Sequence, residues 1–207
     1  MTNFELSRNI FFLLSKHLDR NPNIKKELEE VIRVLLTQFN TTIPENRFTV
    51  GGALEHFVIA VLNTIPGLHA VHTGEISRRS DIKIIYKKED TLISIKGIFS
   101  GAGTNLVNTR GSSNSIRWEE STLFFVSGMG LYYGDPKIIP KKEIRVTADA
   151  LVIGVLSLEK LRKRNKAFFY PLKIPQKFEQ VSLDKSRVAS RELAAQIIKS
   201  SCKILKL

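Results

Sequence analysis

The chain has 207 residues, of which 43% are hydrophobic, enough for one domain with a sizeable core. Its 32 Lys and Arg residues against 20 Asp and Glu residues give a net charge of +12, which favours a polyanionic partner such as nucleic acid. The longest apolar runs are too short to span a membrane, and a single cysteine excludes an internal disulfide framework. The first residues lack the layout of a secretion signal, so we expect a cytoplasmic protein with no membrane partner. An ordinary basic protein, or one with a patch for an acidic protein, is the alternative.

Two amphipathic helices are expected at the start of the chain, over residues 3–20 and 22–39. Apolar residues recur every three or four positions in both, and Asn21-Pro22 begins the second. A third helix, "ALEHFVIAVLNTI" (53–65), is apolar nearly all round, which predicts that it is buried. The C-terminal stretch 189–207 predicts a further amphipathic helix.

Strands are expected to crowd together after the third helix. Apolar runs bounded by turn residues predict them at 68–76, 81–86, 91–99, 122–128 and 150–156. Helices first, then consecutive strands, then an alternation of strand and helix indicate the α/β (α+β) fold class. The expected architecture is a central mixed β-sheet flanked by helices.

The strands "DIKIIY" and "LISIK" carry charged residues where a buried hairpin would be apolar. Strand side chains alternate between faces, so Asp81 and Lys83 share one face of the first strand, and Ser94 and Lys96 share a face of the second. A four-residue loop, 87–90, would set Asp81 opposite Lys96. It would also set Lys83 opposite Ser94, which gathers the polar residues at one end of the hairpin. An ordinary salt bridge at a solvent-facing sheet edge explains the same pattern.

Glu55 is an acid in the apolar third helix, with Val58 and Ile59 at i+3 and i+4. An isolated buried charge costs several kcal/mol, so a carboxylate here must be paired or bind a metal. The alternative is that Glu55 lies in the first turn and interacts with the helix dipole. The four histidines are assigned structural or surface roles: His17, His56, His69 and His72.

A helix glutamate, an aspartate that opens one strand of a hairpin, and "xIK" on the next strand resemble the PD-(D/E)xK nuclease superfamily. Type II restriction endonucleases are its commonest stand-alone members near this size. The resemblance covers about residues 51–100, with "SD" where the family usually has "PD". Ser94 stands where the family's second carboxylate belongs, a variant in which some members recruit a glutamate from a helix. Glu55 would fit that role, with Glu119 or Glu120 as the alternatives.

The resemblance implies a Mg²⁺-dependent phosphodiester hydrolase whose catalytic residues are Glu55, Asp81 and Lys96. Mg²⁺ prefers hard oxygen ligands, typically one or two carboxylates together with phosphate and water. Asp81, Glu55 and the backbone carbonyl of Ile95 would bind the metal. Lys96 would orient or help deprotonate the attacking water and offset phosphate charge.

The stretch 100–117 is rich in Gly, Ser, Thr and Asn and is long for a simple connection. We expect a loop that leaves the catalytic strand and contacts phosphates and base edges of DNA. Arg110, Asn114 and Arg117 are its candidate DNA contacts, and Ser94 is counted with them. A surface loop without a role explains the composition equally well.

These expectations describe a single nuclease domain over residues 1–207, with an N-terminal helical segment (1–45) and a restriction-endonuclease-like catalytic core (46–207). A site-specific type II enzyme needs two sites to cut two strands, so we expect a homodimer on double-stranded DNA. The alternatives are a structure-selective or repair nuclease of the same superfamily, and a nucleic-acid-binding protein without catalysis. In the last case Ser94 would mark a lost site.

Overall fold

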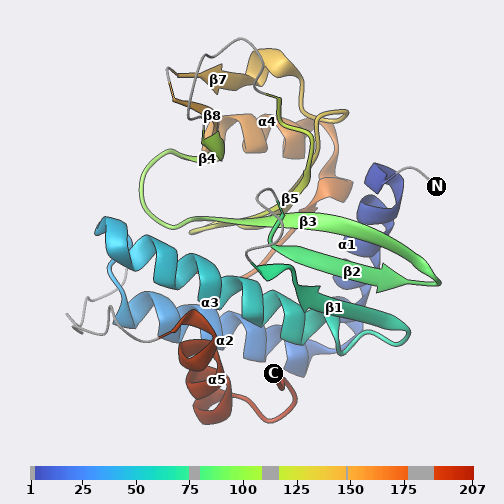
Figure 1. Cartoon of the computed structure of the whole chain (residues 1–207), viewed down its shortest axis with the longest axis vertical. Helices are drawn as coiled ribbons and strands as arrows, with labels where there is room; N and C mark the ends of the chain where they lie inside the picture. The colour runs from blue at the N-terminus through green and yellow to red at the C-terminus, as the bar shows by residue number, and fades with distance from the viewer. Residues whose placement is uncertain (1–2, 75–79, 109–116, 148, 177–188) are drawn as a thin grey trace.

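The structure is a computed structural model that describes residues 3–74, 80–108, 117–147, 149–176 and 189–207 (Figure 1). Its α-helices are α1 (Asn3–Arg20), α2 (Pro22–Gln38), α3 (Pro44–Leu62), α4 (Val155–Arg164) and α5 (Ser190–Ser201). Its strands are β1 (Leu68–His72), β2 (Ile82–Tyr86), β3 (Glu89–Ile98), β4 (Gly103–Asn108), β5 (Ser121–Val126), β6 (Gly130–Gly134), β7 (Ile144–Val146), β8 (Ala150–Gly154) and β9 (Phe169–Tyr170). Within this part of the chain, no helix is long and apolar enough to cross a membrane.

The larger sheet has six strands in the order β1-β2-β3-β5-β6-β9 and is mixed, because β3 and β5 run parallel while the other neighbours are antiparallel. α1 contacts β3, and α3 contacts β1 and β3 (Figure 1). The predicted fold class, a mixed sheet flanked by helices, is therefore confirmed.

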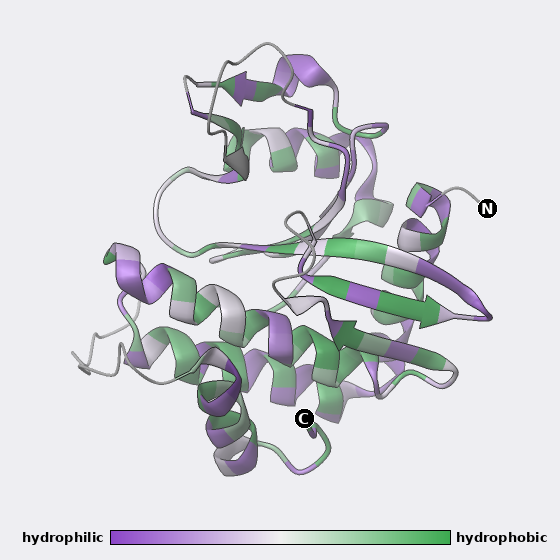
Figure 2. Cartoon of the chain, viewed as in Figure 1, coloured by the Kyte–Doolittle hydropathy of each residue, from purple (hydrophilic) through white to green (hydrophobic). Residues whose placement is uncertain are grey.

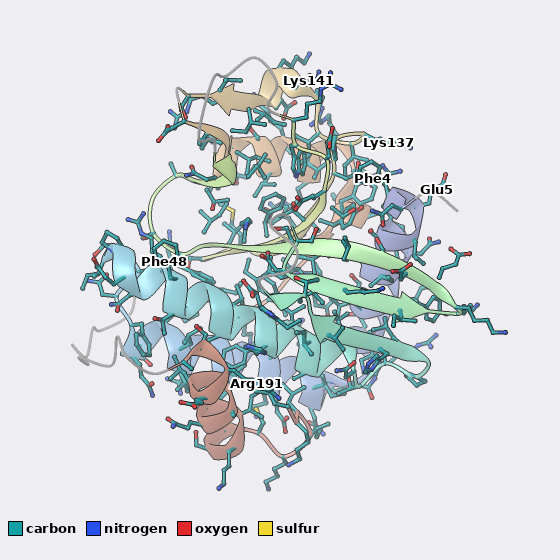
Figure 3. All side chains as sticks on the ribbon, in the orientation of Figure 1. Phe4, Glu5, Phe48, Lys137, Lys141 and Arg191 are labelled. Atoms are coloured by element: carbon teal, nitrogen blue, oxygen red, sulfur yellow. The ribbon has the colours of Figure 1, made fainter. Side chains whose placement is uncertain are left out.

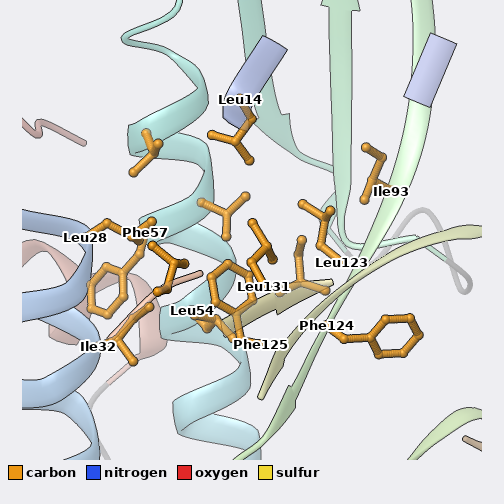
Figure 4. Close-up of a cluster of buried hydrophobic side chains, with 14 of the residues drawn as sticks. Leu14, Leu28, Ile32, Leu54, Phe57, Ile93, Leu123, Phe124, Phe125 and Leu131 are labelled. Carbon is orange, nitrogen blue, oxygen red and sulfur yellow. The ribbon is translucent and has the colours of Figure 1, made fainter. Parts of the chain in front are cut away.

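One hydrophobic core joins the first three helices to this sheet. Leu14, Leu28 and Phe57, one from each helix, belong to the same buried cluster as Ile93 of β3 and Leu123 of β5 (Figure 4). The buried residues of α1 and α2 repeat every three or four positions, as the sequence predicted, whereas the second half of α3 is buried nearly all round. The site described below is therefore positioned by elements that share one packed interior.

A smaller sheet, in the order β4-β8-β7, forms the other part of the fold. Its β8 is the strand that the sequence predicted at 150–156, but it pairs with β4 and β7 and not with the central sheet. The one-turn 3-10 helix at Lys141–Glu143 is coloured as hydrophilic in Figure 2. β8 and α4 nevertheless contribute to the core, because Leu151, Ile153, Leu158 and Leu161 belong to the same buried cluster.

The β2–β3 hairpin has a different register from the predicted one. β2 and β3 are joined by a two-residue turn, Lys87-Lys88, in which both residues have positive φ (50° and 68°). Tyr86 pairs with Glu89 and Ile82 with Ile93, so the predicted four-residue loop is wrong. Two residues with positive φ match the twist of a tight hairpin, which explains why the shorter turn forms.

The correction moves the pairing by two residues. Asp81, just before β2, lies across from Ser94 and not Lys96, and Lys83 pairs with Leu92 and not Ser94. Side chains alternate with period two, so this shift keeps every side chain on its predicted face. Asp81, Ser94 and Lys96 consequently still lie together.

α3 begins at Pro44, nine residues before the predicted start at 53. Proline is favoured at the first helical position, because its missing N–H has no partner there in any case. The stretch "FTVGG" is therefore helical, and Glu55 lies in the middle of α3. The interpretation of Glu55 as a first-turn partner of the helix dipole is wrong for this reason.

The predicted loop 100–117 is in part a strand. Residues 103–108 form β4, which pairs antiparallel with β8. Glycine and asparagine have low strand propensity, but pairing with the apolar β8 overrides it. Arg110 and Asn114 lie outside the described residues, and Arg117 is exposed just before β5.

A buried ion pair ties α1 to the end of β6. Arg8 donates from Nε and a terminal nitrogen to the two carboxylate oxygens of Asp135, at 2.8 and 2.9 Å. The Asp135 side chain is 0% exposed and also accepts from the Tyr133 hydroxyl and two backbone N–H groups. Hydrogen bonding to Asp135 raises the pKa of Arg8 above its ordinary value.

Arg8→Ala should lower the free energy of unfolding by about 3 kcal/mol, because it leaves a buried carboxylate without its charge partner. The matched control is Arg33→Ala, which breaks an exposed two-bond pair with Glu30 and should change stability by less than about 1 kcal/mol. Urea denaturation of both variants measures the difference. Equal losses would contradict a structural role for the buried pair.

Two adjacent glycines of α3 differ in their surroundings. A Cβ atom built on Gly51 meets nothing within 4 Å, whereas one on Gly52 would lie 2.6 Å from the Ser190 hydroxyl of α5. Only Gly52 therefore has a packing reason to be glycine.

Gly51→Ala should raise the free energy of unfolding by about 0.5–1 kcal/mol, because glycine is a poor helix former and the added methyl group meets open space. Gly52→Ala, the matched control, should not gain this stability because its methyl group displaces Ser190. Thermal or urea denaturation compares the two. A gain in Gly52→Ala as large as in Gly51→Ala would show that the described contact with α5 is wrong.

Candidate active site

The Asp81 carboxylate is held at the head of β2 by the neighbouring strand β3. Its Oδ2 accepts a hydrogen bond from the Ser94 hydroxyl at 2.8 Å and from the backbone N–H of Ile95 at 2.6 Å. The ammonium of Lys96 lies 3.7 Å from the same oxygen. The sequence predicted that these residues come together, and they do so with Ser94, not Lys96, directly across from Asp81.

The backbone of Asp81 is fixed as firmly as its side chain. Its N–H donates to the Ile93 carbonyl at 3.2 Å, and its own carbonyl accepts from the N–H of Thr73 at 3.1 Å. These bonds extend the pairing of β2 with both neighbouring strands by one residue. The carboxylate therefore projects from an ordered backbone.

Ile95 was predicted to offer its backbone carbonyl to a metal. The N–H and C=O of one strand residue point to the same edge of the strand. Since the Ile95 N–H donates to Asp81, its carbonyl lies on the Asp81 side of β3. The side chain of Ile95 is buried in the core, so only its backbone is available to the site.

Glu55 approaches the same place from α3. Its side chain is only 16% exposed, and its Oε2 lies 2.7 Å from Nε2 of His72, the last residue of β1. Burial raises the pKa of Glu55 above its ordinary value, and the nearby negative charge of Asp81 raises it further. The hydrogen bond from His72 and the positive charge of Lys96 act in the opposite direction.

His72 is the site residue that sequence reasoning missed. Its Nδ1 accepts a hydrogen bond from the Gly74 N–H at 2.9 Å. The ring proton must then lie on Nε2, which donates to Glu55. The order of the strands could have revealed this neighbour, because an antiparallel hairpin brings the end of β1 beside the start of β2.

His56 packs behind this pair and does not face Asp81. Its ring stacks on that of His72 with centroids 5.1 Å apart. Burial, helped by electrostatic interaction with His72 and Arg191, lowers the pKa of His56 to about 4. His56 is therefore uncharged at neutral pH and supports the His72 ring by packing.

A groove opens beside these residues, which we call the α3 groove. It has a volume of about 440 Å³ and is lined by residues between 41 and 55, between 95 and 100, and between 103 and 105. Glu55 and Lys96 are among the lining residues. The candidate site is thus open to a ligand from the side of α3 and β4.

Glu119 and Glu120, the alternative acids, precede β5. Lys96 pairs with Phe124, so Glu120 lies four residues back along a parallel strand. At about 3.3 Å per residue that is about 13 Å along the strand direction from Lys96. Glu55, in contrast, is close enough to Asp81 and Lys96 for their charges to shift its pKa.

The site offers two carboxylates to a cation. No set of three or more His, Cys, Asp and Glu side chains arranged to hold a metal ion occurs in the described part of the chain. Mg²⁺ does not require such a set, because it takes most of its six oxygen ligands from water and phosphate. A divalent cation near both acids would offset the repulsion that raises the pKa of Glu55.

Comparison of the chain with protein-family models, curated proteins and solved structures gave no match.

Asp81→Asn should lower the pKa of Glu55, because one of the two causes that raise it is the charge of Asp81. Carbon-13 NMR titration of the glutamate carboxyl groups measures the change.

The control is Glu30, whose pKa is held low by its hydrogen bonds to Arg33 far from the site. It should titrate identically in both proteins. An unchanged pKa of Glu55 would show that the two carboxylates are not neighbours in solution.

Proposed function

We propose that this protein is a Mg²⁺-dependent endonuclease that hydrolyses phosphodiester bonds of double-stranded DNA, and more specifically a type II site-specific restriction endonuclease. The observation that carries this proposal is the convergence of Asp81, Glu55 and Lys96 beside an open groove in a chain of net charge +12. Carboxylates for a hard cation and an ammonium for a phosphate are what phosphodiester cleavage requires.

Asp81 and Glu55 would hold the metal, together with the backbone carbonyl of Ile95. When bound, Mg²⁺ makes a water more acidic and offsets the charge of the phosphate. Asp81 keeps its Oδ2 directed by Ser94 and the Ile95 N–H, which fixes where the metal could bind. Among the described residues, none donates a hydrogen bond to the second oxygen of Asp81.

Lys96 would bind the scissile phosphate and orient the attacking water. Its ammonium lies near the Asp81 carboxylate, and Lys96 also lines the α3 groove, so it could contact both the proposed metal site and a bound phosphate. His72 positions Glu55 by donating from Nε2, so the carboxylate is directed without a second cation. Ser94 donates its hydroxyl to Asp81, so its proposed part is to direct that carboxylate.

The resemblance to the PD-(D/E)xK superfamily supports a homodimer, with one site for each strand of a palindrome. A structure-selective or repair nuclease would use the same residues. The alternative outside the enzymes is a DNA-binding protein without catalysis. It is favoured by Ser94, which replaces the second carboxylate of the family motif and donates its hydroxyl to Asp81.

A digest of assorted plasmid and phage DNA separates these functions. Discrete bands with Mg²⁺ and none with EDTA are expected for a site-specific enzyme. A smear that also depends on Mg²⁺ would indicate a nuclease of the other kind. Intact DNA that is nevertheless retarded by the protein would contradict catalysis.

Asp81→Ala should abolish cleavage while DNA binding stays within about tenfold of the unmodified protein, because a metal ligand is lost and not a phosphate contact. The matched control is Asp90→Ala on the same hairpin, which removes an exposed carboxylate paired with Lys83. It should cleave normally. Plasmid cleavage and gel retardation give the two readouts, and full activity in pure Asp81→Ala would refute the catalytic assignment.

Glu55→Gln should reduce the cleavage rate by orders of magnitude and weaken its dependence on Mg²⁺, because the second carboxylate at the site is lost. Glu119→Gln and Glu120→Gln should cleave close to normally. Initial rates across a Mg²⁺ titration compare the three. Normal cleavage by Glu55→Gln together with a defect in either of the others would place the second carboxylate before β5.

A further inference from the structure

One stripe of α3 forms a wall of the α3 groove. Phe48, Gly51 and Glu55 follow one another at i, i+3 and i+7 and therefore share a helix face. Phe48 lies on the early part of α3, next to the connection from β3 to β4 (Figure 3). Along this helix face, the aromatic ring of Phe48 is followed by Gly51, which has no side chain, and then by Glu55, a candidate metal ligand.

Phe48 is unusual among the large apolar side chains. It is 82% exposed, more than any other large hydrophobic residue in the described part of the chain. Exposed apolar residues are common when scattered singly, so exposure alone carries no meaning. Phe48, however, lines the same groove as Glu55 and Lys96, so its ring lies beside the candidate active site.

Gly51 keeps the middle of the stripe open. Nothing in the structure lies within 4 Å of where its Cβ would be, so packing does not require glycine. Alanine at this position would stabilise the helix, whereas Gly51 leaves the helix backbone uncovered. A ligand can therefore approach α3 closely between Phe48 and Glu55.

We propose, on the basis of the function proposed above, that the α3 groove binds one nucleotide whose base has left the DNA stack, with its base against the Phe48 ring. The sugar-phosphate backbone passes over Gly51 toward Lys96. The groove's volume of about 440 Å³ lies within the range of small-ligand sites.

The chemistry of the surface favours a nucleotide over a protein segment. A nucleobase offers a flat π-face for an aromatic ring, and stacking of this kind tolerates any base. The net charge of +12 and the ammonium of Lys96 favour the phosphate that accompanies the base. In an intact duplex both faces of a base are covered by its neighbours, so only an unstacked base can reach Phe48.

The spacing along α3 gives the position of this base. Seven residues separate Phe48 from Glu55, which is about 10 Å along a helix axis. That length corresponds to about three nucleotide steps of B-form DNA. The unstacked base therefore lies a few nucleotides from the phosphate that is cut, and the site favours DNA that is distorted or easily unstacked there.

The test compares binding of two fluorescently labelled duplexes of the same length, one fully paired and one with a short central mismatched bubble. Binding is measured by fluorescence anisotropy in EDTA, so that no cleavage occurs. The unmodified protein should bind the bubble duplex more tightly. Phe48→Ala should lose about tenfold in affinity for the bubble duplex and little for the paired one.

Three further variants make the test specific. Phe48→Trp should keep the preference, because it retains an aromatic ring. Gly51→Leu should lose it, because the side chain fills the groove while leucine remains a good helix former. Val146→Ala removes a 63% exposed apolar side chain on β7, outside the α3 groove, and should behave as the unmodified protein. Circular dichroism checks that each variant is folded.

The outcomes separate the two proposals. Equal affinity of the unmodified protein for both duplexes, or a preference that Phe48→Ala retains, overturns the nucleotide site while Mg²⁺-dependent cleavage still stands. A change in the sedimentation coefficient of Phe48→Ala would instead make Phe48 a contact between two copies of the chain, which also overturns it. Failure to bind either duplex would remove the proposed nuclease function as well.

Discussion

The hydrogen bonds that Asp81 accepts from β3 hold the candidate site together. They require Ser94 and Ile95 to lie beside the head of β2, which depends on the register of the β2–β3 hairpin. That register is set by the two-residue turn Lys87-Lys88 at the far end of both strands. A four-residue turn would instead set Lys96 across from Asp81 and would move the Ser94 hydroxyl and the Ile95 N–H away from the carboxylate.

The second constraint is electrostatic and comes from the helix. Glu55 is placed in the middle of α3, where the apolar residues around it bury the helix and remove water from its carboxylate. Burial and the charge of Asp81 both raise its pKa, while His72 and Lys96 offset part of that effect. Lys96 and His72 offset part of the repulsion between the two acids, and a bound cation would offset more of it, which supports the metal site proposed above.

Much of the fold follows from local patterns, whereas the register does not. Helical periodicity predicted α1, α2 and α5, and strand alternation placed Asp81, Ser94 and Lys96 on one face. The sequence "KKED" does not reveal that two of its residues extend the strands, because lysine seldom adopts positive φ. β4 was missed because its pairing with β8, distant in the sequence, decides its conformation. The role of His72 depends on the same kind of distant contact, between β1 and α3.

The most direct test of the metal site is a titration with Mn²⁺, which shares the oxygen preference of Mg²⁺ and broadens nearby NMR signals. Small amounts of Mn²⁺ should first broaden the amide signals of Ile95, Lys96 and Glu55 in the unmodified protein. The same signals should stay sharp in Asp81→Asn. Equal broadening in both proteins, or broadening confined to exposed acids such as Asp90, would contradict a metal site formed by Asp81 and Glu55.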